Sequence, residues 1–208
     1  MPVSFPIKPF TYQQLGTAAN PASANQPESI GFIFYDSQNF AANFAPVGFF
    51  TAVQNDITLG NIQVAKSLSA DQYFQLWAIT LDWLIGATSQ GSSGAPTIVD
   101  DLLAIYNTSR AIASMTMSYK TMLQAPIHNF HSSGNIYVNY QLGTPAASGL
   151  GNYASSWMPD GGHKVQGSII LAPRQVFTFQ IAGTGVCALS ATRMGRISFH
   201  GVLARKVV

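Results

Sequence analysis

Charged side chains are scarce in this sequence. Lys and Arg number 10 and Asp and Glu number 8 among 208 residues, whereas an ordinary soluble domain is about 25% charged. Other polar groups must keep the surface hydrated, and Gln, Asn, Ser and Thr take that role. The composition suits a subunit whose surface is largely covered by neighbouring copies.

Cysteine and glutamate each occur once, as Cys187 and Glu28. A lone cysteine excludes an intrachain disulfide and a cysteine-built zinc site. Glu28 precedes every histidine, whereas the metal site of cupin barrels needs a glutamate after its paired histidines. Because the chain also lacks Gly-x-Ser-x-Gly, P-loop and dinucleotide-binding motifs, we do not expect an enzyme.

Long apolar runs are missing as well. The longest, residues 73–85, is interrupted by Gln75, Thr80 and Asp82 and falls short of the roughly 20 apolar residues that span a bilayer. The N-terminus lacks the basic start and continuous apolar segment of a secretory signal. We expect neither a transmembrane helix nor a signal peptide.

The few charges are unevenly distributed. Residues 1–104 carry seven acids against two lysines, a net charge of −5, and residues 105–208 carry one acid against eight cations, a net charge of +7. This split would create complementary edges between subunits, or it is neutralised within each monomer; both interpretations stay open. The basic half also suggests contact with nucleic acid or an internal membrane, although its cations are sparse beside typical basic arms.

Residues 1–29 form a candidate arm. Five of the eleven prolines fall there, and proline removes amide donors, so the arm should be extended and should pair poorly inside a sheet. Its apolar residues alternate with Ser, Pro and Thr, so that one side of the arm could lie against a hydrophobic surface, including that of another subunit. These assembly residues are Val3, Phe5, Ile7, Phe10 and Tyr12.

From residue 30 onward, short β-branched and aromatic runs alternate with Gly, Pro, Asn and Ser, which is typical of strands. The pattern predicts an all-β fold, an antiparallel sandwich or barrel in a single domain over residues 30–208. The predicted strands are 30–35, 48–53, 56–65, 72–85, 113–124, 135–141, 165–171, 175–182, 185–192 and 196–208.

For three segments the sequence calls for a separate interpretation. Residues 96–110 are the best candidate for a helix, with Pro96 in the first turn and Arg110 at the C-terminal end. Residues 72–85 are read as a strand, with a second helix as the alternative. Residues 143–164 are rich in Gly, Ser and Pro and predict a long surface loop.

Candidate binding residues are few. In the 143–164 region Asn152, Tyr153 and Trp157 offer a contact surface for a sugar, whereas Trp77 and Trp83 are expected in the core.

Candidate metal ligands are also few. A structural calcium ion would use Asp36, Asp56 and Asp160 with loop carbonyls. A transition metal would use His128 and His131, to which Asp160 and His163 could add an oxygen and a nitrogen ligand. No other metal or cofactor is expected, and neither pattern matches a known ligand spacing.

With these residues laid out, the chain resembles the jelly-roll coat proteins of tailless icosahedral viruses, including bacteriophages. The resemblance lies in the Pro-rich PVSFPIKPF, in SIILAPRQVFTFQI and in the closing RISFHGVLARKVV. It implies a single eight-stranded sandwich with one or two short helices in its connections, and no catalytic residues. It further implies a major, minor or penton capsid protein found in the virion, made in the host cytoplasm, that self-assembles and contacts other virion proteins.

A small-molecule substrate is not expected. The alternatives are a carbohydrate- or receptor-binding sandwich using Asn152, Tyr153 and Trp157, and a metal-dependent barrel enzyme.

Overall fold

The computed structural model describes residues 27–41, 43–84, 101, 111–130, 133–140, 151–157, 163–183, 189 and 192–206. The assembly residues of the arm lie outside these ranges. The strands are β1 (Pro27–Phe40), β2 (Val47–Phe49), β3 (Gln72–Leu84), β4 (Ala111–Met117), β5 (Lys120–Pro126), β6 (Ser133–Tyr140), β7 (Gly151–Trp157), β8 (His163–Leu171), β9 (Phe177–Gly183) and β10 (Arg193–Lys206), with a 3-10 helix η3 (Ile127–Phe130) after β5.

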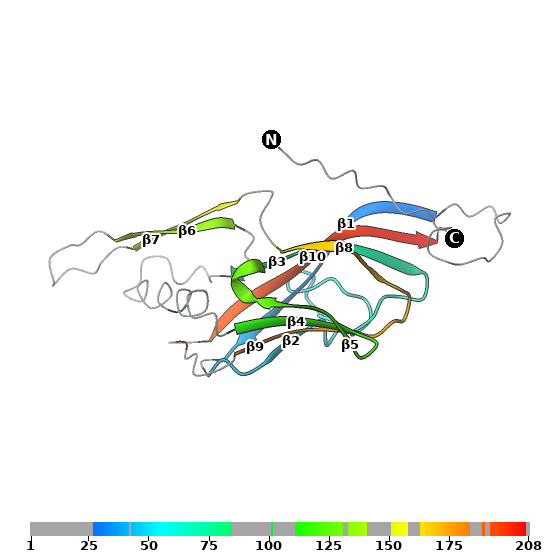
Figure 1. The fold of residues 1–208 in the computed structure, drawn as a ribbon, viewed down its shortest axis with the longest axis horizontal. Helices are drawn as coiled ribbons and strands as arrows, with labels where there is room; N and C mark the ends of the chain where they lie inside the picture. Colours follow the sequence, from blue (N-terminus) through cyan, green and yellow to red (C-terminus); the bar gives the residue numbers. More distant parts are fainter. Residues whose placement is uncertain are drawn as a thin grey trace.

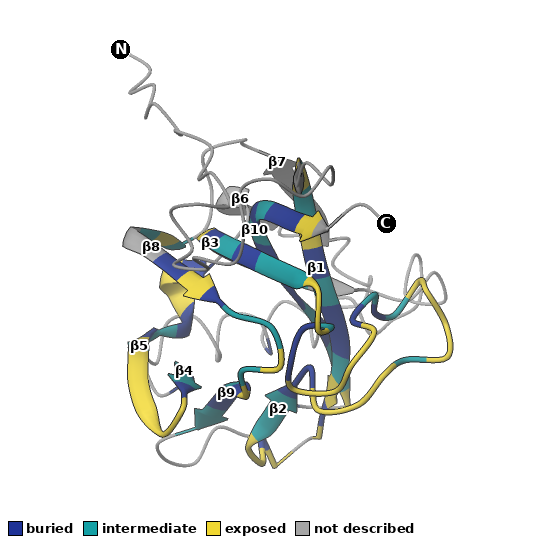
Figure 2. Ribbon diagram, turned by 90° about the vertical axis from the view of Figure 1, so that its right-hand side faces the viewer, coloured by how far each residue is buried: buried dark blue, intermediate teal, exposed yellow. Residues whose placement is uncertain are grey.

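The strands form two four-stranded antiparallel sheets in the orders β1-β10-β3-β8 and β2-β9-β4-β5, and a separate hairpin of β6 and β7. Figure 2 shows the two larger sheets as layers, with β8, β3, β10 and β1 above β5, β4, β9 and β2. Helix in the described part is limited to η3 and the single helical residue Asp101. The all-β, two-sheet expectation is therefore confirmed.

The pairing of the strands is nested along the chain. β1 pairs with β10, β2 with β9, β3 with β8, and β4 with β5, so, apart from the β6–β7 hairpin, the pairing is that of one long hairpin folded over on itself. Figure 1 shows the outermost pair, β1 in blue beside β10 in red. The tip of that hairpin is a two-residue turn at Ser118 and Tyr119, whose φ angles are 47° and 68°. Two positive φ angles are what a type I′ turn requires.

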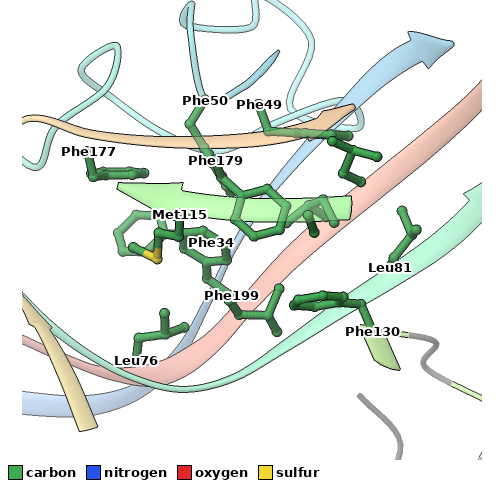
Figure 3. Packing of buried hydrophobic residues seen from close by; sticks show 14 of the residues in the cluster. Phe34, Phe49, Phe50, Leu76, Leu81, Met115, Phe130, Phe177, Phe179 and Phe199 are labelled. Atoms are coloured by element: carbon green, nitrogen blue, oxygen red, sulfur yellow. The ribbon is translucent and has the colours of Figure 1, made fainter. Parts of the chain in front are cut away.

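The core lies between the two sheets and is dominated by phenylalanine. Phe199 of β10 packs against Phe179 of β9 with ring centroids 5.5 Å apart, and Phe50, just after β2, approaches Phe199 at 4.7 Å. All three side chains are fully buried, and Figure 3 shows them between the sheets with Leu76 and Met115. Burying apolar area of this kind contributes about 25 cal/mol per Å² and holds the sheets together.

Some predicted elements were wrong. The predicted strand 113–124 is two strands, because the chain reverses at Ser118 and Tyr119. Residues 56–65 are turns with isolated bridges, because their contact with the edge of β1 is limited to a few backbone and side-chain hydrogen bonds at Leu59 and Asn61 and does not extend into a ladder. The predicted loop 143–164 contains β7, which pairs with β6.

Three further predicted elements lie wholly or partly within the described residues. Residues 72–84 form β3, so the helix alternative is wrong. Of the predicted helix 96–110 only Asp101 is described, and it is helical. Of the predicted strand 185–192 only Leu189 and Thr192 are described, and neither is in a strand.

The prediction that Trp77 lies in the core was wrong. It is 42% exposed, because β3 carries a β-bulge in which Leu76 and Ala78 pair with consecutive residues of β10 and leave Trp77 between them without a partner on that strand. Leu76 is buried, and the extra residue turns toward the outside of the sheet. The side chain of Trp83, the other expected core tryptophan, lies outside the described residues.

Candidate functional surface

The outer edge of β1 is partly covered by another segment. The backbone N–H of Ser37 donates to the carbonyl of Leu59 at 2.7 Å, and Asn61 N–H donates to the carbonyl of Tyr35 at 3.1 Å. The Asn61 side chain accepts from Tyr35 N–H and donates to the carbonyl of Ile33, both at 2.8 Å. Exposed edge groups invite pairing with other chains, and here residues 59–61 satisfy them over residues 33–37.

A buried carboxylate anchors the start of the connection between β2 and β3, which contains the covering residues 59–61. Asp36 is fully buried, and its two oxygens accept hydrogen bonds from the backbone N–H of Phe50 at 2.6 Å and from the side-chain amides of Gln38 and Gln54 at 2.9 Å each. Hydrogen bonds to an ionised group are stronger than those between neutral groups. Asp36 therefore ties β1 to the start of the connection that leads to β3.

Arg196 of β10 holds the same segment from the outer face of the sheet. Its Nε donates to Ser37 Oγ at 3.0 Å, its Nη2 donates to the Thr58 carbonyl at 2.5 Å, and its guanidinium lies 5.1 Å from the centroid of the Tyr35 ring. The Tyr35 hydroxyl donates to the Ile57 carbonyl at 2.5 Å. In the sequence, Arg196 is one of the eight cations of residues 105–208 and nothing marks it for this role.

The outer face of the β1-β10-β3-β8 sheet exposes large apolar side chains. Ile33 of β1 is 46% exposed, Trp77 of β3 42% and Ile170 of β8 37%. Ile33 lies opposite His200, which in turn lies opposite Ala78, next to Trp77. Exposed apolar residues gathered on one face are a feature of interaction surfaces.

Two histidines belong to this sheet. His200 Nε2 lies 3.0 Å from Thr80 Oγ1; burial lowers the pKa of His200, and the charge of Asp82 opposes this shift without cancelling it. His163 packs against the Phe130 ring with centroids 4.9 Å apart, and burial lowers its pKa as well. Both imidazoles are therefore held toward the neutral form.

The predicted sugar-binding residues share one strand. Asn152, Tyr153 and Trp157 all lie in β7 and pair with Asn139, Val138 and Ser133 of β6. The expectation that they stand in a loop was wrong, because Gly151–Trp157 is a regular strand of the hairpin. Their side chains lie outside what the structure describes.

The predicted metal ligands do not converge where they are described. The carboxylate of Asp36 binds amide donors, and Asp56 Oδ1 accepts from the backbone N–H and hydroxyl of Thr58 at 2.8 and 2.7 Å, a local turn that lowers the pKa of Asp56. Asp160 and His131 lie outside the described residues. Within the described residues no group of three or more His, Cys, Asp or Glu side chains is placed to hold a metal ion.

The sequence did not indicate that Asn61, Gln54 and Asp101 hold parts of the fold together through hydrogen bonds or an ion pair. Asp101 is buried and forms an ion pair with Arg193 at 2.6 Å. The only local signal for the covering segment was the Asp56-x-Thr58 pattern of a side-chain-stabilised turn, which says nothing about what the segment contacts.

A scan against models of protein families finds no match, and no curated protein sequence matches the chain. None of the helical residues described belongs to a helix long and apolar enough to cross a membrane. The pairing of the strands establishes the class of the protein as an antiparallel β-sandwich.

Proposed function

We propose that this chain is a structural subunit of an icosahedral viral capsid, folded as a single jelly roll and acting by self-assembly rather than catalysis. The observation that carries the proposal is the strand order. Numbered along the chain without the β6–β7 hairpin, the eight sandwich strands run 1-8-3-6 in one sheet and 2-7-4-5 in the other. A jelly roll is a double sheet of eight antiparallel strands made of two Greek keys, and this order fits it.

The surface chemistry supports an assembling subunit. With 18 charged residues in 208, copies can approach one another while removing few charges from water, a step that is costly. The apolar side chains on the outer face of β1, β3 and β8 add contact area of the kind that interfaces bury. Assembly would also cover sheet edges that otherwise favour aggregation.

The proposed partners are other copies of this chain and further virion proteins. The basic C-terminal half of the chain, residues 105–208, is the proposed region for contact with a genome or an internal membrane. The proposed location is the virion, after synthesis in the host cytoplasm.

The test is the mass of the purified protein across concentration and salt, by light scattering and sedimentation, followed by imaging of large species. Rings, trimers, pentamers or shells are expected. A strict monomer at every concentration would overturn the proposal.

A carbohydrate-binding module is the second candidate, favoured by Tyr153 and Trp157, which occupy positions of one face of β7 outside the two main sheets, whereas Asn152 occupies a position of the other face. It predicts that a glycan raises the Tm of the protein and that Trp157→Ala abolishes this increase. A glycan array with no binding to the intact protein would overturn it.

A further inference from the structure

The covered edge of β1 continues into an open one. In an antiparallel strand the N–H and C=O groups of alternate residues point to the same edge, and Ile33, Tyr35 and Ser37 point theirs toward residues 59–61. The pairing of β1 with β10 is continuous, so Ser29 and Gly31 point their groups to the same outer edge. Within the described residues no backbone group pairs with that edge at either position.

The space beside this open edge is suited to a large side chain. Gly31 is exposed, and a Cβ added to it would have no atom within 4 Å. Ile33, two residues away, leaves 46% of its surface exposed on the same face. Ile30 and Phe32, which alternate with these residues, are only partly buried against the core. A further strand at this edge would cover apolar groups on both faces of the sheet.

The arm has the proline spacing of a strand that pairs on one side only. Pro2 and Pro6 occupy even positions, so the odd residues Val3, Phe5 and Ile7 keep their N–H groups on one edge and the prolines fall on the other. Proline is tolerated in edge strands when its nitrogen faces away from the ladder. A segment of this kind can extend a sheet by one strand and end it there.

We propose that residues 2–8 of a second copy add to the open edge of β1 at Ser29–Ile33 as an antiparallel strand. The inference rests on the proposed function, since it names the contact through which assembling copies bind. Asn61 already donates to the Ile33 carbonyl, so the added strand can bond only the N–H of Ile33 there and ends at this residue.

The register follows from the side chains. Phe5 opposite Gly31 places the aromatic ring over the glycine, where space is open, and brings Val3 opposite Ile33. Directly opposed residues on one face interact, so Val3 and Ile33 would form an apolar pair. If the added strand were shifted by one residue, the nitrogen of Pro6 would face the ladder, and one hydrogen bond would be lost because proline has no N–H.

An arm from a second copy is favoured over the chain's own arm, because the chain's own arm would need a long loop to reach β1. If residues 2–8 paired with their own β1, residues 9–26 would have to form the loop, which is longer than the about 12–15 residues that structureless loops usually reach in compact domains. An arm from a neighbouring copy carries no such constraint.

Disulfide trapping between copies tests the inference. Two full-length variants are made in a Cys187→Ser background, Val3→Cys and Ile33→Cys, one with a tag that separates mixed dimers on a non-reducing gel. The Cα atoms of opposed strand residues lie about 5.5 Å apart, which is within the range of a disulfide. The matched control replaces Ile33→Cys by Ile170→Cys, a comparably exposed position on the opposite edge strand of the same sheet.

The expected result is a mixed 3–33 dimer that forms at least about tenfold faster than the 3–170 dimer, since one pair is held in contact and the other meets only by collision. If light scattering shows assembled species but the 3–33 dimer is not preferred, the inference is wrong and the proposed function stands. If the protein is monomeric and no mixed dimer forms, both are wrong. A 3–33 disulfide found only inside the double variant Val3→Cys/Ile33→Cys would overturn the second copy as the source of the strand.

A second variant pair measures the energetic effect. Ile33→Lys places a charge at the open edge, and Met122→Lys, on the edge strand β5 of the other sheet, is its control; both positions are exposed enough for the fold to tolerate the change. We expect Ile33→Lys to raise the concentration needed for assembly about tenfold, equivalent to about 1.4 kcal/mol, and Met122→Lys to raise it less. Equal effects of the two variants would contradict the proposed edge.

Discussion

Replacing Asp36 with alanine should destabilise the protein and loosen the segment that covers β1. The side chain is fully buried, and its carboxylate accepts the backbone N–H of Phe50, which is buried too. Removing the acceptor leaves that N–H unsatisfied, at a cost of about 1–3 kcal/mol, and removes hydrogen bonds to a charged group worth about 1.5–3 kcal/mol each. The partly buried Gln38 and Gln54 can turn toward water, so we expect a total near 3 kcal/mol.

A loss of about 3 kcal/mol corresponds to a decrease in Tm of about 10 °C for a chain of this size. The measurement is thermal unfolding by circular dichroism at equal protein concentration, because assembly stabilises by mass action. Hydrogen exchange gives an independent readout, since the amides of Tyr35 and Ser37 are bonded to Asn61 and Leu59 and should exchange faster in the variant.

Two controls accompany the Asp36 experiment. Asp36→Asn keeps the shape but turns one acceptor into a donor, so its Tm should fall between those of wild type and Asp36→Ala. Asp71→Ala changes an exposed carboxylate and should have little effect. If Asp36→Ala unfolds at the same temperature as Asp71→Ala and its Tyr35 amide exchanges no faster, then Asp36 does not anchor the segment.

Three further changes have expected outcomes. Gly201→Ala should lower the Tm and weaken the β10–β3 pairing, because a Cβ would lie 2.1 Å from the Gln75 carbonyl oxygen and overpacking costs about 1–3 kcal/mol or more; an unchanged Tm would contradict this contact. Ser118→Asn with Tyr119→Gly should raise stability by about 1–2 kcal/mol in urea unfolding, because residues other than glycine are strained at positive φ; a loss of stability would show that side-chain contacts outweigh the strain. Burial lowers the pKa of His200 from its usual 6.5, so the unfolded chain binds the proton more readily and stability should fall as pH drops below 6.5; His200→Gln should reduce this loss, and an identical pH profile would refute the role of this histidine.

Much of the secondary structure could be predicted from local pattern. Runs of β-branched and aromatic residues bounded by Gly, Pro and Ser indicated β10 and β8, and the choice of strand over helix for residues 72–84 was right. The turn at Ser118 and Tyr119 was missed because the pair lacks the Asn-Gly or Asp-Gly signal of a type I′ hairpin. Tertiary contacts support the turn, since Gln175 Nε2 donates to Ser118 Oγ at 3.2 Å and Ser118 N–H donates to the Val176 carbonyl at 3.2 Å.

The candidate surface was less predictable than the strands. The exposure of Trp77 depends on a bulge that appears only when β3 is aligned with β10. The role of Asn61 depends on Tyr35 and Ile33, more than 25 residues earlier in the chain. The sequence placed Asn152, Tyr153 and Trp157 in a loop and did not indicate that β6 would pair with their segment.

The sequence by itself determined the fold class, because period-two alternation and β-branched and aromatic runs are local properties of each segment. It also determined the low charge of the surface and the proline spacing of the arm. Only the tertiary structure decided which strands are neighbours, which edge of β1 is covered and where it stays open. The physical reason is that backbone hydrogen-bonding groups are alike in every strand, so the choice of partner depends on which pairing lets side chains distant in sequence, such as Phe50, Phe179 and Phe199, close a single core.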